Sequence, residues 1–402
     1  MAVSSTDTSQ LIAFLENEKD IEVVRDTFKE TYIQNGEVFK GGVKEAIEVF
    51  SEGRSPQYLI IDISKSDLPV SELSKLSDLC DPGVNVIAVG KKNDVGLYRD
   101  LMKLGIFEYL VSPLFPEIVG RALKNMILGE EKGKGPQSRL GKIIAVAGSR
   151  GGVGSTFITT NLAAILSDEK FRRVVIVDLN LHFGTVALYF DLKPNLGLRN
   201  ALEDPDRIDQ VFLERILTPV NERLYILSSE EPLDEQINYK VDGIENLLKY
   251  LSKLFHYVIV DVPHYSNDVT QVVLESAQIM LLVTDPSLAG LRDSGRLLRL
   301  YGVERVDHRV IFVMNKWGAS TKSEVKLPDF EEALKHKVDH LISYDPVLPM
   351  ECVNRGKTLV GEENSLADSL RKIANNVQGV QEQEKSQSGW KHFFESFKLK
   401  KS

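Results

Sequence analysis

Short apolar runs alternate with segments of helical spacing along the first third of the chain. The runs predict strands at residues 11–15, 58–63, 84–89 and 109–111. Apolar positions that recur every three or four residues predict helices at 43–50, 97–104 and 118–127. This alternation predicts a parallel sheet covered by helices on both faces.

The same pattern returns in the second part of the chain. Apolar runs predict strands at 143–147, 173–178, 256–261, 279–284 and 310–314, and residues 156–166 have the spacing of a helix. Residues 325–340 are polar and rich in Lys and Glu, so we expect a solvated surface helix there. Together the two parts predict an α/β protein with two parallel sheets.

A glycine-rich stretch, SRGGVGST at residues 149–156, joins the strand at 143–147 to the helix that follows. Backbone N–H groups converge in such a loop and the helix start adds partial positive charge, which predicts a phosphate cradle. Thr156 stands where a P-loop places its magnesium-binding hydroxyl, but Ser149 replaces the first Gly and Ser155 the Lys. Arg150 is always protonated and would replace part of the positive charge that the missing Lys normally supplies. The alternative is a glycine-rich turn without a ligand.

Two strands of the second part end in a carboxylate, Asp178 and Asp261. Because ligands of an open parallel sheet gather at the carboxyl ends of its strands, we expect both side chains to face the loop. Asp261 has the character of a Walker B residue, which would hold magnesium near Thr156. The alternative is that both carboxylates cap helices.

Composition restricts the range of functions. At 402 residues the chain is long enough for two or three domains. A net charge of −9 argues against coating nucleic acid, so no nucleic-acid partner is expected. Two distant cysteines, Cys80 and Cys352, form no metal-binding pattern and favour a reducing compartment. The polar start and the absence of a run of 18 apolar residues predict a cytoplasmic protein without a spanning helix.

The composition also divides the chain. Residues 1–128 form the first predicted domain, and the charged, glycine-rich segment 129–139 is a predicted linker. Residues 140–376 form the second domain, and 377–402 a polar tether with a terminal helix.

The last 14 residues, 389–402, combine aromatic and basic positions. Trp390, Phe393, Phe394 and Phe397 fall on one face of a helix. Four Lys and one Glu give this segment a net charge of +3. Such a helix suits the interface of an anionic membrane, which would place the protein at the inner face of the cell membrane or at a cell pole. Docking on protein and disorder are the alternatives.

The strand Tyr58–Asp62 and the later segment GIFEYLVSP at 105–113 resemble a response-regulator receiver domain. The resemblance implies a flavodoxin-like fold in which Asp62 takes the phosphate-accepting position. Ser112 stands where receivers carry a Lys, Gly90 where they carry Ser or Thr, and Glu16 with Asn17 where they carry an acidic pair. We therefore expect an unphosphorylated docking domain, with Asp62 capping a turn.

Residues 140–375 resemble the MinD/ParA group of deviant Walker ATPases. The loop aligns with G-K-G-G-x-G-K-T, and the segments after Asp178, at 283–293, at 313–316 and at 343–346 align with further motifs. The resemblance implies a doubly wound parallel-sheet P-loop NTPase fold that binds ATP and Mg. It assigns nucleotide binding to Gly151, Gly152, Val153, Gly154, Ser155, Thr156, Asn315 (adenine), Asp345 and Pro346. It assigns magnesium binding to Thr156, Asp178 and Asp261. It assigns catalysis to Arg150, Asp178 and Asp261.

Departures from the pattern predict weak chemistry. In this group the early Lys of the loop reaches across a nucleotide-sandwich dimer, and Arg150 stands in its place. Ser155 removes the second Lys, and Asn180 replaces a carboxylate that could take a proton from water. We expect nucleotide binding with slow or no hydrolysis, in a homodimer.

A receiver-like domain fused to such an ATPase domain resembles the TadZ/CpaE family. The resemblance implies a localisation or assembly factor for a Tad (Flp, type IV) pilus, with pilus secretion machinery proteins as partners. An active MinD/ParA-like ATPase that positions membrane or DNA cargo is the alternative, although the acidic balance disfavours DNA. A nitrogenase-iron-protein-like reductase needs two cysteines per subunit in this domain, which holds only Cys352.

Overall fold

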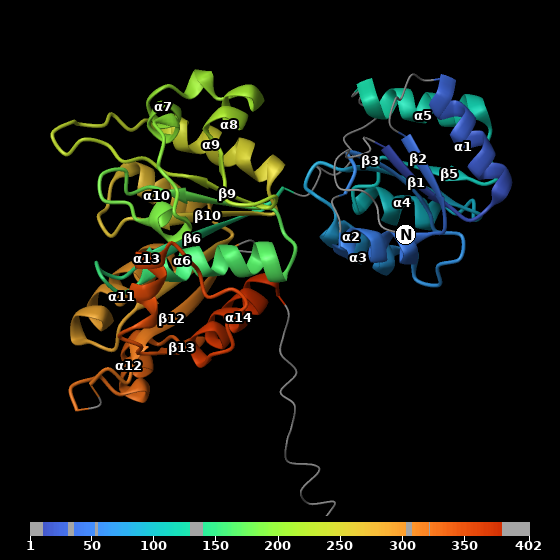
Figure 1. Ribbon diagram of the computed structural model, residues 1–402. Coiled ribbons are helices and arrows are strands. Elements are labelled where there is room, and N and C mark those ends of the chain that lie inside the picture. Colours follow the sequence, from blue (N-terminus) through green and yellow to red (C-terminus); the bar gives the residue numbers. More distant parts are fainter. Residues whose placement is uncertain are drawn as a thin grey trace, which may run out of the picture.

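The computed structural model describes residues 11–30, 36–52, 55–128, 140–302, 308–320 and 322–379. These residues form two sheets that belong to separate parts of the chain (Figure 1). We call residues 11–128 the N-terminal unit and residues 140–379 the C-terminal unit. The predicted linker at 129–139 and the predicted terminal helix at 389–402 lie outside the described residues.

The N-terminal unit contains a five-stranded parallel sheet in the order β2-β1-β3-β4-β5. Helices α1 and α5 pack on one face through one apolar cluster, and α2, α3 and α4 pack on the other face through a second cluster. This arrangement confirms the predicted flavodoxin-like fold. The strands are β1 Leu11–Leu15, β2 Gly36–Lys40, β3 Tyr58–Asp62, β4 Asn85–Gly90 and β5 Glu108–Val111, and the helices are α1 Glu18–Glu30, α2 Val43–Glu52, α3 Pro69–Leu79, α4 Val95–Lys103 and α5 Pro116–Leu128.

The C-terminal unit contains an eight-stranded sheet in the order β13-β12-β11-β6-β10-β7-β9-β8. Every neighbouring pair is parallel except the edge pair β8 and β9. The strands are β6 Lys142–Gly148, β7 Val174–Asp178, β8 Thr218–Pro219, β9 Leu224–Leu227, β10 Tyr257–Val262, β11 Ile279–Thr284, β12 Arg309–Trp317 and β13 His340–Ser343.

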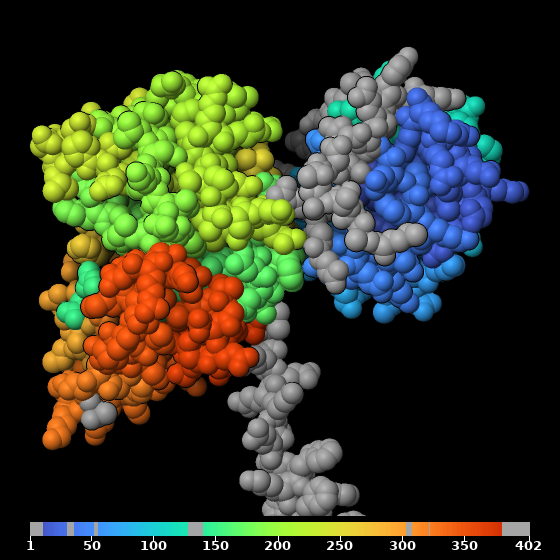
Figure 2. Space-filling view, viewed as in Figure 1, coloured from blue at the N-terminus to red at the C-terminus, as the bar shows by residue number. Residues whose placement is uncertain are grey.

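Helices cover both faces of this second sheet, which confirms the predicted doubly wound architecture. Helix α6, its π-helical continuation η1 and helices α13 and α14 share one apolar cluster, and α14 lies beside α6 on the surface that Figure 2 shows. Helices α7 to α12 share the cluster on the other face. The helices are α6 Ser155–Ala164, η1 Ile165–Glu169, η2 Val186–Phe190, α7 Gly197–Glu203, η3 Pro205–Arg207, α8 Gln210–Ile216, α9 Val241–Leu254, α10 Asp268–Ser276, α11 Leu288–Tyr301, α12 Leu327–Leu334, α13 Leu348–Arg355 and α14 Ser365–Gln378.

No helix among the described residues has the length and apolar character that crossing a bilayer requires.

The sequence pattern failed where elements are charged or short. In the N-terminal unit the elements α1, β2 and α3 were missed; α1 consists mostly of charged residues and buries one narrow stripe. In the C-terminal unit the strands β8, β9 and β13 and the helices α7 to α11, α13 and α14 were missed as well. The surface helix predicted at 325–340 is confirmed only over Leu327–Leu334, and its extent was wrong. Helix α12 has only 8 residues, and its Phe330 is fully buried against Phe312. The chain turns at Lys335, which has φ 52°, and reaches β13 at His340.

The carboxylate of Asp62 is occupied by main-chain donors, as the turn-capping interpretation expects. It accepts hydrogen bonds from the amides of Ser64 (2.7 Å) and Glu16 (3.1 Å). Glu16 itself pairs with Lys65 at 2.6 Å. Ser112, at the position of the receiver Lys, donates to the buried carboxylate of Asp20 at 2.5 Å. Among the described residues, no cation contacts the carboxylate of Asp62 directly, and the absence of phosphorylation stays a prediction.

The two units meet where α3 turns into β4. The carbonyl of Cys80 accepts a hydrogen bond from His256 Nε2 at 2.9 Å, and Arg172 donates to the carbonyl of Asp78. His256 Nδ1 accepts from the amide of Arg173 at 3.0 Å, so the ring is neutral and carries its hydrogen on Nε2. Burial, with the charge of Arg172 second, lowers the pKa of His256 to about 4. The contact therefore needs the uncharged imidazole.

Acidification should weaken this contact. Because the pKa of His256 in the contact lies below its ordinary value of 6.5, stability that is complete above pH 6.5 is lost as the pH falls toward 4. Between pH 7 and pH 5 the expected loss is about 2 kcal/mol. Small-angle scattering should show the wild type expanding over this range more than His256→Gln, which keeps a neutral donor. Equal expansion of the two proteins would contradict the assignment.

Candidate functional site

The glycine-rich loop lies between the end of β6 and the start of α6. Strand β6 is buried along nearly its whole length, and every residue of α6 from Phe157 to Ala164 is buried. Gly154 precedes the helix with φ +93°, and a Cβ there would lie 2.5 Å from Asn315 Nδ2. Glycine is required at this position both by the backbone angle and by the close contact. The helix therefore begins at Ser155 with its free amides at the loop.

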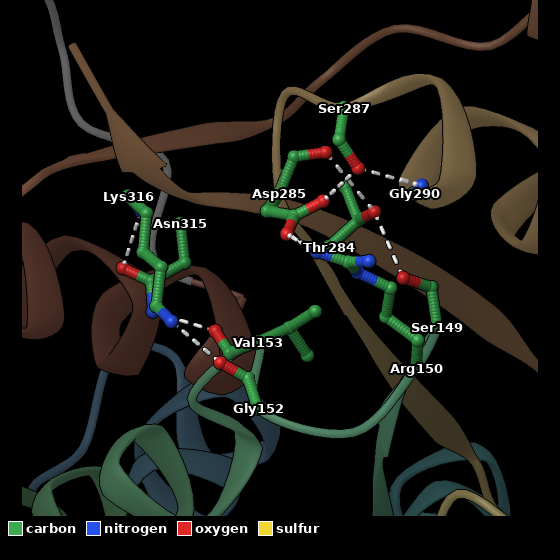
Figure 3. A network of polar contacts seen from close by, with 10 residues as sticks. All are labelled: Ser149, Arg150, Gly152, Val153, Thr284, Asp285, Ser287, Gly290, Asn315 and Lys316. Carbon is green, nitrogen blue, oxygen red and sulfur yellow. Dashed lines mark hydrogen bonds and ion pairs between the residues drawn. The ribbon is translucent and has the colours of Figure 1, made fainter. Parts of the chain in front are cut away.

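Strand β11 holds one flank of the loop (Figure 3). The amide of Ser149 donates to the carbonyl of Val283 at 2.8 Å, and its hydroxyl lies 2.9 Å from that of Thr284. Arg150 forms an ion pair with Asp285, with Nη2 2.6 Å and Nε 3.2 Å from the same carboxylate oxygen. Asp285 is further fixed by the hydroxyl of Ser287 at 2.5 Å.

The end of β12 holds the other flank. Asn315 Nδ2 donates to the carbonyl of Val153 at 2.8 Å, and Lys316 Nζ donates to the carbonyl of Gly152 at 2.6 Å. Figure 3 shows the loop between these two residues on one side and the pair of Arg150 with Asp285 on the other. Two strands that lie far from the loop in sequence thus fix its conformation.

A cavity of about 440 Å³ opens beside the loop on the side of β12. It brings together seven residues that the sequence assigned to a nucleotide, namely Gly152, Gly154, Ser155, Thr156, Asn315, Asp345 and Pro346. Its apolar lining was not predicted and consists of Phe157, Tyr189, Pro349, Met350, Val353 and Leu366. Such a lining suits a flat ring, because an apolar cavity with few polar groups is typical of ligand sites.

Asp345 lies at the cavity but already serves the fold. Its Oδ1 accepts hydrogen bonds from the amides of Val347 and Leu348, both at 2.8 Å, where α13 begins. Asn315 is likewise engaged, since its Oδ1 accepts from the amide of Lys316 at 2.8 Å. Each side chain keeps part of its hydrogen-bonding capacity for a ligand.

A second cavity of about 140 Å³ adjoins the loop on the side of β7 and β10. Its lining includes the predicted residues Arg150, Gly151, Thr156, Asp178 and Asp261. Val153 lines neither cavity, because its side chain is fully buried. The remaining lining residues are Gly148, Gly152, Ser155, Asn180, Phe183, Gly184, Thr185, Val262, Pro263 and His264.

Asp178 and Asp261 are neighbours in the parallel ladder of β7 and β10. Asp178 accepts hydrogen bonds from the amides of Asn180 (3.1 Å) and Val186 (3.2 Å). Asp261 accepts from the hydroxyls of Thr156 (2.6 Å) and Thr159 (3.2 Å). Burial raises the pKa of both carboxyls, and for Asp178 the neighbouring charge of Asp261 adds to the effect.

These residues fit a magnesium ion. Two buried carboxylates in adjacent positions repel each other, and a divalent cation between them would relieve that repulsion. Thr156 adds a hydroxyl bonded to one of them, and all of these donors are hard oxygen ligands. Gly184 packs closely against the pair, because a Cβ there would lie 2.4 Å from Asp178 Oδ2 and 2.6 Å from the carbonyl oxygen of Asn180.

His264 is a residue that the sequence reading missed. It follows Asp261 by three positions and lines the second cavity. A Cβ at Gly151 would lie 3.6 Å from the imidazole, so the ring lies directly over the loop. The only available signal was its place just after the strand that ends in Asp261.

Replacing Asp261 by Asn should separate stability from metal binding. The substitution removes the repulsion with Asp178, and the hydroxyls of Thr156 and Thr159 can rotate to suit the amide. We expect the free energy of unfolding of the ligand-free protein to increase by about 1 kcal/mol, which corresponds to a rise in Tm of about 2–4 °C. Magnesium should no longer increase the affinity for ATP, as measured by calorimetry.

Asp178→Asn is the matched control. Main-chain N–H groups face both oxygens of Asp178, so an amide there opposes a donor to a donor and should lower the Tm. A magnesium effect on ATP affinity that persisted in Asp261→Asn would contradict the proposed metal site.

Comparison with known proteins agrees with this geometry. Residues 141–303 match the AAA domain family AAA_31. The septum site-determining protein MinD of Synechocystis is 24% identical over 250 residues, which cover 60% of this chain and 90% of that protein. A ParA family ATPase from Chlorobium tepidum superposes with a TM-score of 0.52 at 25% identity, covering 59% of this chain and 98% of that one. The pilus assembly protein CpaE from Caulobacter crescentus covers 29% of this chain and 97% of its own, at 28% identity and a TM-score of 0.28.

Residues 141–303 are therefore similar to the AAA domain family, and the C-terminal unit has the parallel-sheet P-loop fold of the MinD and ParA ATPases.

Proposed function

We propose that this protein binds ATP and magnesium at the glycine-rich loop and acts as a dimerising localisation or assembly factor for a Tad pilus secretion system. In this proposal ATP is a structural ligand that is hydrolysed slowly or not at all. The nucleotide base occupies the larger cavity, the phosphates lie along the loop, and the magnesium ion is held by Thr156, Asp178 and Asp261.

One observation carries the binding proposal. The loop stands open, with a cavity of about 440 Å³ on one side and one of about 140 Å³ on the other. Free amides at the start of α6 face these spaces and are complementary to a phosphate. The pair of repelling carboxylates also faces them and is complementary to a divalent cation. A glycine-rich turn without a ligand would have no need for the apolar cavity or the buried carboxylate pair.

Three features support slow hydrolysis. Ser155 supplies no ammonium group to the phosphates, and Asn180 cannot accept a proton from water. Arg150 pairs with Asp285 of its own chain, and the side chain of Asp285 is only 12% exposed. In a dimer Arg150 would have to leave this ion pair before it could reach a neighbouring subunit.

The order of the two units supports the localisation role. A receiver-like unit, in whose described part no cation contacts Asp62, precedes the P-loop unit, and this layout resembles the TadZ/CpaE family. We propose that nucleotide-dependent pairing brings two receiver-like units together and so forms the docking surface for pilus secretion proteins. Anchoring to a membrane through residues 389–402 stays a prediction.

Equilibrium binding tests the central claim. We expect the wild type to bind ATP in the presence of magnesium, and Ser155→Lys to bind it roughly 10- to 100-fold more tightly through a charge-assisted contact. Thr156→Val should lose the magnesium dependence. Isothermal titration would overturn the proposal if neither the wild type nor Ser155→Lys bound ATP.

Steady-state phosphate release distinguishes the alternative, an active ATPase that uses Arg150. We expect slow release that changes less than twofold in Arg150→Ala. Loss of roughly 1,000-fold in that variant, the effect of removing a catalytic arginine, would favour the active enzyme. Asp285→Asn, which frees Arg150 from its ion pair, serves as the matched variant and should accelerate release only if Arg150 acts in catalysis.

A further inference from the structure

We propose that Lys316 holds the nucleotide loop in its binding conformation and supplies the positive charge that the loop itself lacks. This inference rests on the proposed function for its ligand, a nucleoside polyphosphate. The loop carries Ser155 where a lysine is usual, so the ammonium group comes instead from the end of β12.

The backbone at Lys316 is built to point its side chain at the loop. Lys316 has φ +59°, a left-handed conformation that disfavours any side chain other than glycine. The pairing of β12 with β13 shifts register between Met314 and Trp317, which spans this residue. Both sides of the irregularity are fixed, because the amide of Lys316 donates to Asn315 Oδ1 and the amide of Tyr344 donates to the carbonyl of Trp317. A strained residue inside a bulge is typical of a re-aimed functional side chain.

The contact that results acts on the main chain of the loop. Lys316 Nζ donates to the carbonyl of Gly152 at 2.6 Å, and Asn315 Nδ2 donates to the next carbonyl, that of Val153, at 2.8 Å. In a trans peptide the N–H points opposite to the C=O. Holding both carbonyls toward β12 therefore turns the amides of Val153 and Gly154 to the opposite side of the loop. The charge of the ammonium also polarises the peptide that it contacts.

Lys316 is also the single cationic residue among those described that line the larger cavity. The other cation attached to the loop, Arg150, is neutralised by Asp285. A nucleotide with its base in the larger cavity and its phosphates along the loop would therefore meet its nearest uncompensated positive charge at Lys316. A nucleoside without phosphates would gain nothing from that charge.

The comparison of three ligands tests this role. We expect Lys316→Met to bind ADP and ATP about tenfold or more weakly than the wild type, while its affinity for adenosine changes less than twofold. Lys316→Arg should retain most of the affinity for ADP and ATP, because the charge is kept. Lys322→Met removes an exposed lysine from the same connection after β12 and should change none of the three.

Two results of this titration would overturn the inference. Unchanged affinity of Lys316→Met for ADP and ATP would show that the ammonium group is dispensable. An equal loss for adenosine, ADP and ATP would show that the residue only shapes the cavity and contributes no charge to phosphate binding.

A measurement without nucleotide separates this inference from the proposed function. Hydrogen–deuterium exchange of the ligand-free protein should be at least threefold faster at the loop amides 152–156 in Lys316→Met than in the wild type or Lys322→Met. If the wild type binds no nucleotide, the proposed function fails and with it the ligand named here, but faster exchange would still establish Lys316 as the residue that positions the loop. Unchanged exchange would refute the positioning role whether or not nucleotide binds.

Discussion

The parallel register of β7 and β10 places two carboxylates side by side inside the protein. Asp178 and Asp261 are direct partners in the ladder, and both are nearly fully buried. Buried like charges are among the costliest arrangements in a protein. The local sequence compensates for this cost: two main-chain amides donate to one carboxylate, two threonine hydroxyls donate to the other, and Gly184 permits the close approach of the backbone to Asp178. A proton shared by the pair, as their raised pKa values indicate, or a cation bound between them would relieve the repulsion.

The loop beside these carboxylates depends on contacts from both sides. Ser149 and Arg150 are tied to β11, while Gly152 and Val153 are tied to β12. Side chains of the protein itself therefore fix much of the conformation of the loop. The site is thus pre-organised, which lowers the conformational cost of binding. The same contacts hold the charged side chains Arg150 and Lys316 in place, so these side chains do not move freely toward a reacting phosphate. A binding site that is rigid and poor in mobile charge fits a nucleotide that is held rather than consumed.

The contact between the two units lies at the opposite ends of the same strands. His256 immediately precedes β10, and Arg172 and Arg173 precede β7. The N-terminal unit therefore rests on strands whose other ends carry Asp261 and Asp178. Any displacement of these strands by a ligand would be transmitted to the contact with the receiver-like unit, because close-packed protein interiors transmit small shifts.

The sequence by itself determined five neighbouring strands of the C-terminal sheet (β12, β11, β6, β10 and β7), the loop and the fold class. Buried parallel strands read as continuous apolar runs, and glycines with a following helix mark a phosphate loop, so local pattern was enough. It failed for the charged helix α1 and for α12, whose length is set by Phe330 packing under β12. Only the tertiary structure decided which side chains reach the loop. Asp285, Lys316 and His264 come from the ends of three different strands, and no pattern within one segment reveals that they converge. Contacts of this kind depend on strand order and on a single irregular φ angle, which hydrophobic periodicity does not encode.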